Sequence, residues 1–305
     1  MIGLVAGLLG CAPPAPLPAA PPAPVAAEVP APAEVDLSVR RDAAWIAARL
    51  QRIERAIRDP SVSDEDAAAQ GHLQQRIYRL LADDPVLAAD VVKRSDPALR
   101  EWIERNTAGT ASIARTVPSP KTDLPPWRIV EPAPAAELLA HYRAAEAAHG
   151  VPWHVLASIH LNETRMGRLR GASDAGARGP MQFMPATWAA YGEGDIEKDA
   201  DAIAAAARYL AAMGFAQDPR KALWHYNHSD AYIDAILSFS DVMAADARAY
   251  RGYWGWQVYY RTIRGGIWLS AGYESLERQP IEAWCASRGE PHCPTLGDEP
   301  GTPER

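Results

Sequence analysis

Apolar residues recur at intervals of three and four along most of the chain, and this spacing constrains the fold more than any other feature. One such face runs from Ile46 to Ile57, and a second runs from Leu73 to Leu81. This spacing is typical of amphipathic helices. Long alternating stretches typical of half-buried strands do not occur, and the abundant alanine favours helices. The sequence therefore predicts a mainly α fold, with a short β-hairpin expected only near a glycine-rich loop that ends at Pro185.

The first residues, 1–11, are typical of an export signal. An apolar run ends at Cys11 and is too short to cross a bilayer as a helix. Leu8-Leu9-Gly10-Cys11 resembles a bacterial lipobox, in which the cysteine carries a lipid, although no Lys or Arg precedes the run. Residues 12–35 are rich in Ala and Pro and indicate an extended tether. We therefore expect lipidation at Cys11 and a membrane-anchored, exported protein.

The remaining chain divides by composition. Residues 36–107 predict a small helical bundle, in which Asp84-Pro85 and Asp96-Pro97 place a capping residue before a proline in the first turn. Residues 108–134 are rich in Pro, Thr and Ser and indicate a linker. Helical patterns resume in residues 135–270, which we expect to form a second domain. Residues 271–305 are expected to be a loop-rich tail.

The net charge and the cysteine content indicate which partners and cofactors this chain is expected to lack. The net charge of −7 argues against a nucleic-acid partner, which usually requires a basic face. Cys285 and Cys293 are close enough in sequence to form a disulfide in an oxidising compartment, although two free thiols remain an alternative. Only His292 could join them as a zinc ligand, and no fourth ligand is evident. We expect no metal and no cofactor.

Glu163 is the strongest candidate for a catalytic residue. It follows Leu156 and Ile159 on the apolar face of a helix expected over residues 152–166, where burial of a charge is costly. Gly167 is expected to end this helix, so Glu163 would lie in the last turn, where the dipole is negative. Both effects favour a protonated side chain, which suits a general acid. The alternative is a surface glutamate paired with Arg165 or Arg168.

Three sequence blocks around Glu163 carry a family resemblance. They are Asn162-Glu163-Thr164, the loop from Ser173 to Trp188 that contains Gly-Pro-Met-Gln and Met-Pro-Ala-Thr, and Tyr226-Asn227. In this order they resemble the lysozyme-like lytic transglycosylases of the soluble and membrane-bound murein types. The resemblance covers residues 135–243. Thr164 stands where the family usually has serine, and it keeps a hydroxyl.

The resemblance implies a reaction and a set of site residues. Glu163 would protonate the glycosidic oxygen between muramic acid and N-acetylglucosamine, then act as base on the C6 hydroxyl of that muramic acid. The product would carry a 1,6-anhydro ring, and the substrate would be peptidoglycan glycan strands. The resemblance assigns substrate contacts to six residues: Ser173, Met181, Gln182, Phe183, Tyr226 and Asn227. For Met181, Phe183 and Tyr226, simple core packing is the alternative.

Two other functions stay open from the sequence. A hydrolytic muramidase would need a second carboxylate facing Glu163, for which Asp174, Glu193 and Asp195 are candidates. A peptidoglycan-binding module without activity could use aromatic residues such as Trp188 and Trp224. The expected location is the cell envelope, either at the outer face of the cytoplasmic membrane or otherwise extracellular. The sequence predicts no particular protein partner.

Overall fold

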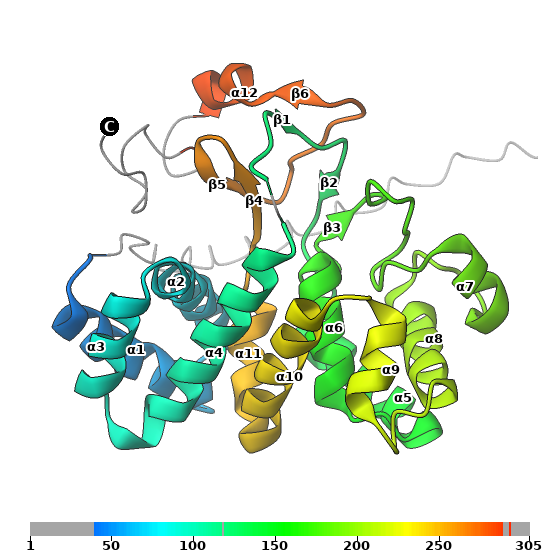
Figure 1. Ribbon diagram of the computed structural model, residues 1–305, viewed down its shortest axis with the longest axis horizontal. Coiled ribbons are helices and arrows are strands. Elements are labelled where there is room, and N and C mark those ends of the chain that lie inside the picture. Colours follow the sequence, from blue (N-terminus) through cyan, green and yellow to red (C-terminus); the bar gives the residue numbers. More distant parts are fainter. Residues whose placement is uncertain (1–39, 118, 289–292, 294–305) are drawn as a thin grey trace, which may run out of the picture. The chain divides into compact units, whose positions relative to one another are not determined.

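The computed structural model describes residues 40–117, 119–288 and 293. Cys11, the residue 12–35 segment and most of residues 289–305 lie outside this range. The fold is mainly α, consistent with the lysozyme-like class (Figure 1). The helices are α1 (Ala43–Arg58), α2 (Asp64–Asp83), α3 (Pro85–Arg94), α4 (Pro97–Arg115), α5 (Ala135–His149), α6 (Trp153–Thr164), α7 (Pro185–Tyr191), α8 (Asp199–Ala212), α9 (Pro219–Tyr226), α10 (Asp230–Ala245), the 3-10 helix η1 (Ala247–Ala249), α11 (Tyr250–Trp254) and α12 (Ile281–Arg288).

Capping side chains start the first four helices. The Ser63 hydroxyl accepts a hydrogen bond from the Asp66 backbone N–H at 3.0 Å, and Asp42 caps α1 in the same way. Asp84 and Asp96 cap α3 and α4, each with a proline in the first turn. These side chains satisfy backbone N–H groups that have no partner within the helix. The Asp-Pro pairs thus start helices as the sequence predicts.

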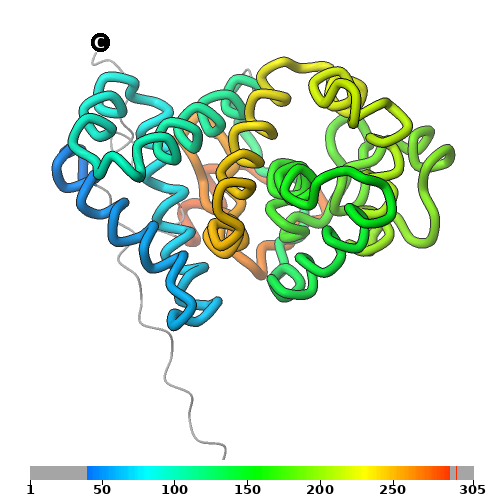
Figure 2. The backbone as a smooth tube through the Cα atoms, turned by 90° about the horizontal axis from the view of Figure 1, so that it is seen from below, coloured from blue at the N-terminus to red at the C-terminus, as the bar shows by residue number. Residues whose placement is uncertain are grey.

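Helix α4 is longer than the sequence indicated. It continues to Arg115, so residues 108–115 are helical and do not belong to a linker that starts at residue 108. α4 packs along α10 (Figures 1 and 2). A Cβ at Gly109 would come within 2.9 Å of the Phe239 ring. The small residues that suggested a linker instead allow this close helix contact. The buried apolar residues of 43–103 and 135–256 form one continuous core.

A second close contact joins α2 to α11. A Cβ on Gly71 would lie 2.1 Å from the backbone oxygen of Gly252. Alanine is the better helix former, but here its methyl group would force two backbones apart. We expect Gly71→Ala to lower the free energy of unfolding by about 1–3 kcal/mol. Urea denaturation would measure this change in the free energy of unfolding. A variant more stable than the wild type would contradict the close contact between Gly71 and Gly252.

The C-terminal part contains the longest strands. β4 (Val258–Thr262) and β5 (Gly265–Leu269) form an antiparallel hairpin, with Tyr260 opposite Ile267. In the glycine-rich loop, the expected short hairpin is reduced to one antiparallel bridge, in which Arg178 and Phe183 exchange backbone hydrogen bonds of 2.9 and 2.8 Å. Just before this loop, β3 (Leu169–Arg170) pairs with β2 (Arg128–Ile129). The sequence did not predict the β4–β5 hairpin, because its central residues are apolar on both faces of the strands and therefore show no alternation of apolar and polar side chains.

The chain after β5 packs onto this hairpin. β6 (Gln279–Pro280) pairs with β1 (Asp123–Leu124), and α12 follows it. Trp284 joins Val258, Ile267 and Leu269 in a small separate core. Cys285 and Cys293 form a disulfide with their Cα atoms 5.6 Å apart, which agrees with the expected pairing. Within the described range, no helix combines the length and apolar character needed to cross a membrane.

Candidate active site

Glu163 lies in the last turn of α6, a helix that packs against α10 (Figure 1). The helix ends at Thr164, and its C-cap is Arg165 rather than the expected Gly167. Arg165 and Met166 have positive φ values of 54° and 61°, which non-glycine residues rarely adopt. The Met166 N–H donates to the His160 carbonyl at 3.2 Å and holds the chain in this turn. Such strained backbone is often kept at functional sites.

The surroundings of Glu163 favour its protonated form. The residue is only partly exposed, and burial raises the pKa of its carboxyl group from 4.5 to about 7. A hydrogen bond from the Tyr232 hydroxyl, at 2.6 Å, and the positive charge of Arg165 act in the opposite direction. Burial has the larger effect on this pKa. Near neutral pH, Glu163 can therefore both donate and accept a proton, as a residue that acts first as acid and then as base must.

The loop after α6 is anchored to the end of that helix. The Thr164 hydroxyl donates to the Pro180 carbonyl at 2.6 Å and accepts from the Gly167 N–H at 3.1 Å. Gln182 has a positive φ of 49°, and its side-chain amide donates to the Gly179 carbonyl at 2.9 Å. The hydroxyl at position 164 thus fixes the position of the Gly-Pro-Met-Gln segment beside Glu163.

Tyr226 connects α9 to the same loop. Its hydroxyl donates to the Met181 carbonyl at 2.7 Å, and the nearby Glu163 adds to the effect of burial in raising the Tyr226 pKa. Gln182, Phe183 and Tyr226 line a small pocket together with four more residues: Met184, Thr187, Tyr209 and His225. The structure therefore brings Gln182 and Tyr226 together at this pocket, and Tyr226 also lies within electrostatic reach of Glu163.

Comparison with protein-family models gives a match that includes the loop after α6. A family model described as "Transglycosylase SLT domain" matches residues 169–222. Residues 169–222 are thus part of a transglycosylase SLT domain. The match begins after Glu163 and ends before Tyr226, so it covers the loop and α8 but not the candidate acid. Neither the curated proteins nor the solved structures gave a match to this chain.

Two residues assigned to the substrate by resemblance are packed in the core of the SLT domain. The Met181 side chain is fully buried, so it cannot line a cleft, and only its carbonyl takes part by accepting from Tyr226. Phe183 is 3% exposed, and its ring packs edge-on against Trp188 and Tyr226. For both side chains, core packing is the better interpretation.

Ser173 and Asn227 have local structural contacts. The Ser173 hydroxyl accepts from the Ala177 N–H at 3.0 Å and closes a turn in the loop. The Asn227 N–H donates to the Leu223 carbonyl and ends α9, while its side chain stays partly exposed. These contacts leave the Asn227 amide group accessible to a ligand, and they tie up one lone pair of the Ser173 hydroxyl.

Each candidate for a second carboxylate has a partner outside the Glu163 site. Asp174 pairs with Arg278 at 2.5 Å and Lys121 at 3.7 Å. Glu193 pairs with Arg208 at 2.9 Å. Asp195 accepts from the Glu197 N–H at 3.0 Å, as in a turn. These contacts leave Glu163 as the carboxyl group of the site. Among the residues that the structure describes, no group of three or more His, Cys, Asp or Glu residues could hold a metal ion.

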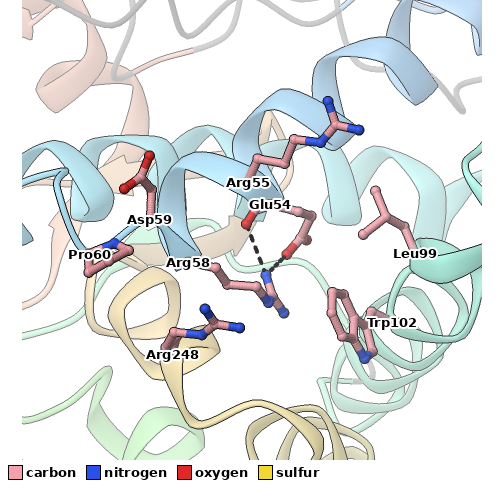
Figure 3. A pocket seen from close by; sticks show the side chains of 8 residues that line it. All are labelled: Glu54, Arg55, Arg58, Asp59, Pro60, Leu99, Trp102 and Arg248. Carbon is pink, nitrogen blue, oxygen red and sulfur yellow. Dashed lines mark hydrogen bonds and ion pairs between the residues drawn. The ribbon is translucent and has the colours of Figure 1, made fainter.

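A cavity of about 320 Å³ lies elsewhere in the chain, among the first helices (Figure 3). Arg58 points into it beside Trp102, with its guanidinium carbon 4.0 Å from the ring centroid. Arg58 forms ion pairs with Glu54 and with Asp246, and Arg248 also pairs with Asp246. Because these charges neutralise one another, we assign the cavity a structural role.

Tyr232 was not singled out by sequence reasoning, although it makes the direct hydrogen bond to Glu163. We expect Tyr232→Phe to raise the pKa of Glu163 above about 7, because the lost hydrogen bond stabilises the ionised carboxylate. A carbon-13 NMR titration of the Glu163 carboxyl would measure this. Tyr209→Phe is the matched control, since its hydroxyl donates to the His225 carbonyl instead. An unchanged or lowered pKa in Tyr232→Phe would contradict the assignment.

Proposed function

We propose that this protein cleaves peptidoglycan glycan strands as a lytic transglycosylase, with Glu163 as the catalytic acid and base. The observation that carries the proposal is the partly buried Glu163, with a pKa near 7, beside the SLT loop and hydrogen-bonded to Tyr232. A carboxyl group with this pKa can give a proton to a glycosidic oxygen at neutral pH.

The reaction needs one carboxyl group when the substrate supplies its own nucleophile. Glu163 protonates the glycosidic oxygen as the bond from muramic acid C1 to that oxygen breaks. The ionised Glu163 then takes the proton from the C6 hydroxyl of the same muramic acid, and O6 bonds to C1. The product is a 1,6-anhydro ring, Glu163 is protonated again, and no water is consumed.

Neighbouring side chains have supporting roles in this proposal. Tyr232 orients the Glu163 carboxyl through its hydrogen bond. Asn227 is partly exposed and offers its amide group to the sugar hydroxyls. Gln182 offers its amide oxygen, because its NH2 group donates to the Gly171 and Gly179 carbonyls. Tyr226 holds the loop through Met181, so its contribution to substrate binding comes from its ring. Ser173 shapes the loop and contributes its hydroxyl hydrogen to the substrate.

Two alternatives are less well supported. A hydrolase of the two-carboxylate type needs a second acid about 5–9.5 Å from the first, and Asp174, Glu193 and Asp195 are each engaged elsewhere. A binding module has no use for an acid with a raised pKa. The pKa of Glu163 therefore favours an enzyme.

We further propose that the protein works in the cell envelope, anchored by a lipid on Cys11. The Cys285–Cys293 disulfide supports this location, because disulfides persist in oxidising compartments. Cys11 lies outside the described residues, so this part of the proposal rests on the sequence.

Digestion in water enriched in oxygen-18 tests the reaction type. We expect fragments of purified peptidoglycan without the heavy isotope at the muramic acid end, because C1 bonds to O6 of the same sugar. One oxygen-18 atom in each new muramic acid end would show hydrolysis instead. Release of no fragments, with binding to the sacculus retained, would support the binding module.

A further inference from the structure

One face of α2 lies against the β4–β5 hairpin and carries basic residues. His72, Gln75, Arg76 and Arg79 follow one another at the spacing that places residues on a single helix face. The Gln75 side-chain amide donates to the Gln257 carbonyl at 2.9 Å and accepts from its N–H at 2.8 Å. His72 Nε2 lies 2.9 Å from the Tyr259 hydroxyl. These contacts fix the helix face against β4.

Arg76 and Arg79 share Tyr259 as a neighbour. The guanidinium carbon of Arg79 is 4.6 Å from the centroid of the Tyr259 ring, and Arg76 interacts with the Tyr259 hydroxyl. Burial lowers the pKa of His72 to about 3, so this histidine is neutral. On this face, Arg76 and Arg79 therefore both contact the uncharged Tyr259 side chain.

Arg165 brings a third positive charge next to the catalytic residue. It follows Glu163 by two positions, and its guanidinium donates to the Leu161 carbonyl. Burial and the positive charge of Arg79 lower its pKa to about 10, against the opposite effect of Glu163. Arg165 thus lies within electrostatic reach of Arg79 on α2 and of Glu163 on α6.

We name Arg76, Arg79 and Arg165 the arginine cluster, and none of them forms an ion pair in the part of the chain that the structure describes. Within residues 40–117, 119–288 and 293, none of the three has a carboxylate oxygen within 4.0 Å. By contrast, Arg168 pairs with Glu131 at 2.7 Å, and Arg170 pairs with Asp199 at 3.3 Å. All three side chains of the cluster are partly exposed, so an anion from solution can reach them. A positive cluster that no carboxylate neutralises by an ion pair, in a chain of net charge −7, indicates a site for an anion.

We propose that the arginine cluster binds a carboxylate of the stem peptide attached to the muramic acid at the cleaved bond. This inference rests on the proposed function. The glycan strand itself is uncharged, and the carboxylates of peptidoglycan are on its peptides. Guanidinium groups bind carboxylates through paired, charge-assisted hydrogen bonds. Helix α2 then supplies part of the substrate site of the SLT domain.

A peptide carboxylate bound to the arginine cluster also changes the pKa of Glu163. Glu163 is faced by Arg165, by Tyr232 from α10 and by Tyr226 from α9. The positive charge of Arg165 lowers the Glu163 pKa. A peptide carboxylate on the cluster offsets that charge, so Glu163 stays protonated to higher pH. We therefore expect the alkaline limb of the rate profile to lie at higher pH for strands that carry peptides.

The test compares glycan strands that carry stem peptides with strands whose peptides an amidase has removed. We expect wild-type protein to cut the peptide-bearing strands with the higher kcat/KM, and Arg79→Gln to lower that preference about tenfold. Arg52→Gln removes the same charge from an exposed position on α1 and should keep the wild-type preference. Arg79→Lys keeps the positive charge and should keep part of the preference for peptide-bearing strands. Equal preference in Arg79→Gln and Arg52→Gln would overturn the proposal.

A binding measurement separates failure of this inference from failure of the proposed function. Calorimetry with the free stem tetrapeptide should show binding to the wild type and to Arg52→Gln, and at least tenfold weaker binding to Arg79→Gln. Equal binding to all three proteins, or binding to none, would reject the subsite. If no strand is cut while the tetrapeptide still binds through Arg79, the enzymatic proposal fails and the subsite stands. Circular dichroism of Arg79→Gln and Arg79→Lys shows whether each variant is folded.

Discussion

Glu163→Gln is expected to lower cleavage of peptidoglycan by at least about 10³-fold while leaving the fold intact. Glutamine has nearly the same shape and can still accept the Tyr232 hydrogen bond, but it cannot deliver a proton to the glycosidic oxygen. Release of soluble fragments from sacculi measures the effect. Glu104→Gln, at an exposed position on α4, is the matched control and should cut normally. Near-normal activity of Glu163→Gln would remove this residue from the mechanism.

The same variant has a second expected effect, on stability. The pKa of Glu163 is about 7 in the folded protein against 4.5 for an unperturbed side chain, so folding favours the protonated form. This contribution to the free energy of unfolding is present below pH 4.5 and is lost as the pH rises to about 7. Glu163→Gln lacks this loss. We therefore expect the variant to gain stability relative to the wild type between these pH values, as measured by urea denaturation.

Gly179→Ala is expected to lower activity by about 10²-fold, because it displaces the loop that carries Gln182. Gly179 has a φ of 74°, and a Cβ there would lie 2.0 Å from the backbone oxygen of Ile196. Neither the turn nor the neighbouring backbone can accept a methyl group without moving. Glycine at the start of the Gly-Pro-Met-Gln segment is thus explained by a close approach of two chain segments.

Gly176 in the same loop provides a matched control for that prediction. Its φ is 86°, and a Cβ there would meet nothing within 4 Å. Gly176→Ala should cost about 1 kcal/mol of backbone strain and keep most of the activity. Initial rates on purified peptidoglycan measure both variants. Equal losses in the two variants would show that backbone strain, rather than the contact with Ile196, sets the requirement for glycine.

The sequence predicted the helices well because their apolar faces are periodic and their starts are capped. The same periodicity placed Glu163 on the packed face of α6, and the structure gives it partial burial. The end of α6 was less predictable, since the turn places Arg165 and Met166 at positive φ, where glycine is the usual residue. The extension of α4 past residue 107 depends on packing against α10, which local composition does not reveal.

Two features of the site depend on contacts between distant segments. Tyr232 reaches Glu163 across 69 positions of sequence, and nothing local distinguishes it from a core tyrosine. Met181 and Gln182 are neighbours in a loop, where no periodicity says which side chain is buried. The structure buries Met181 and turns Gln182 toward the pocket. Sequence motifs located this site, while the roles of its residues depend on the tertiary structure.

Mass spectrometry of the muropeptides released by the purified full-length protein tests the central claim most directly. The account predicts products that end in 1,6-anhydromuramic acid, one water lighter than hydrolytic products, from the wild type and none from Glu163→Gln. Products with reducing muramic acid ends would contradict it. That result would require a second carboxylate or a positioned water at Glu163, and the ion pairs of Asp174 and Glu193 would then have to open during the reaction.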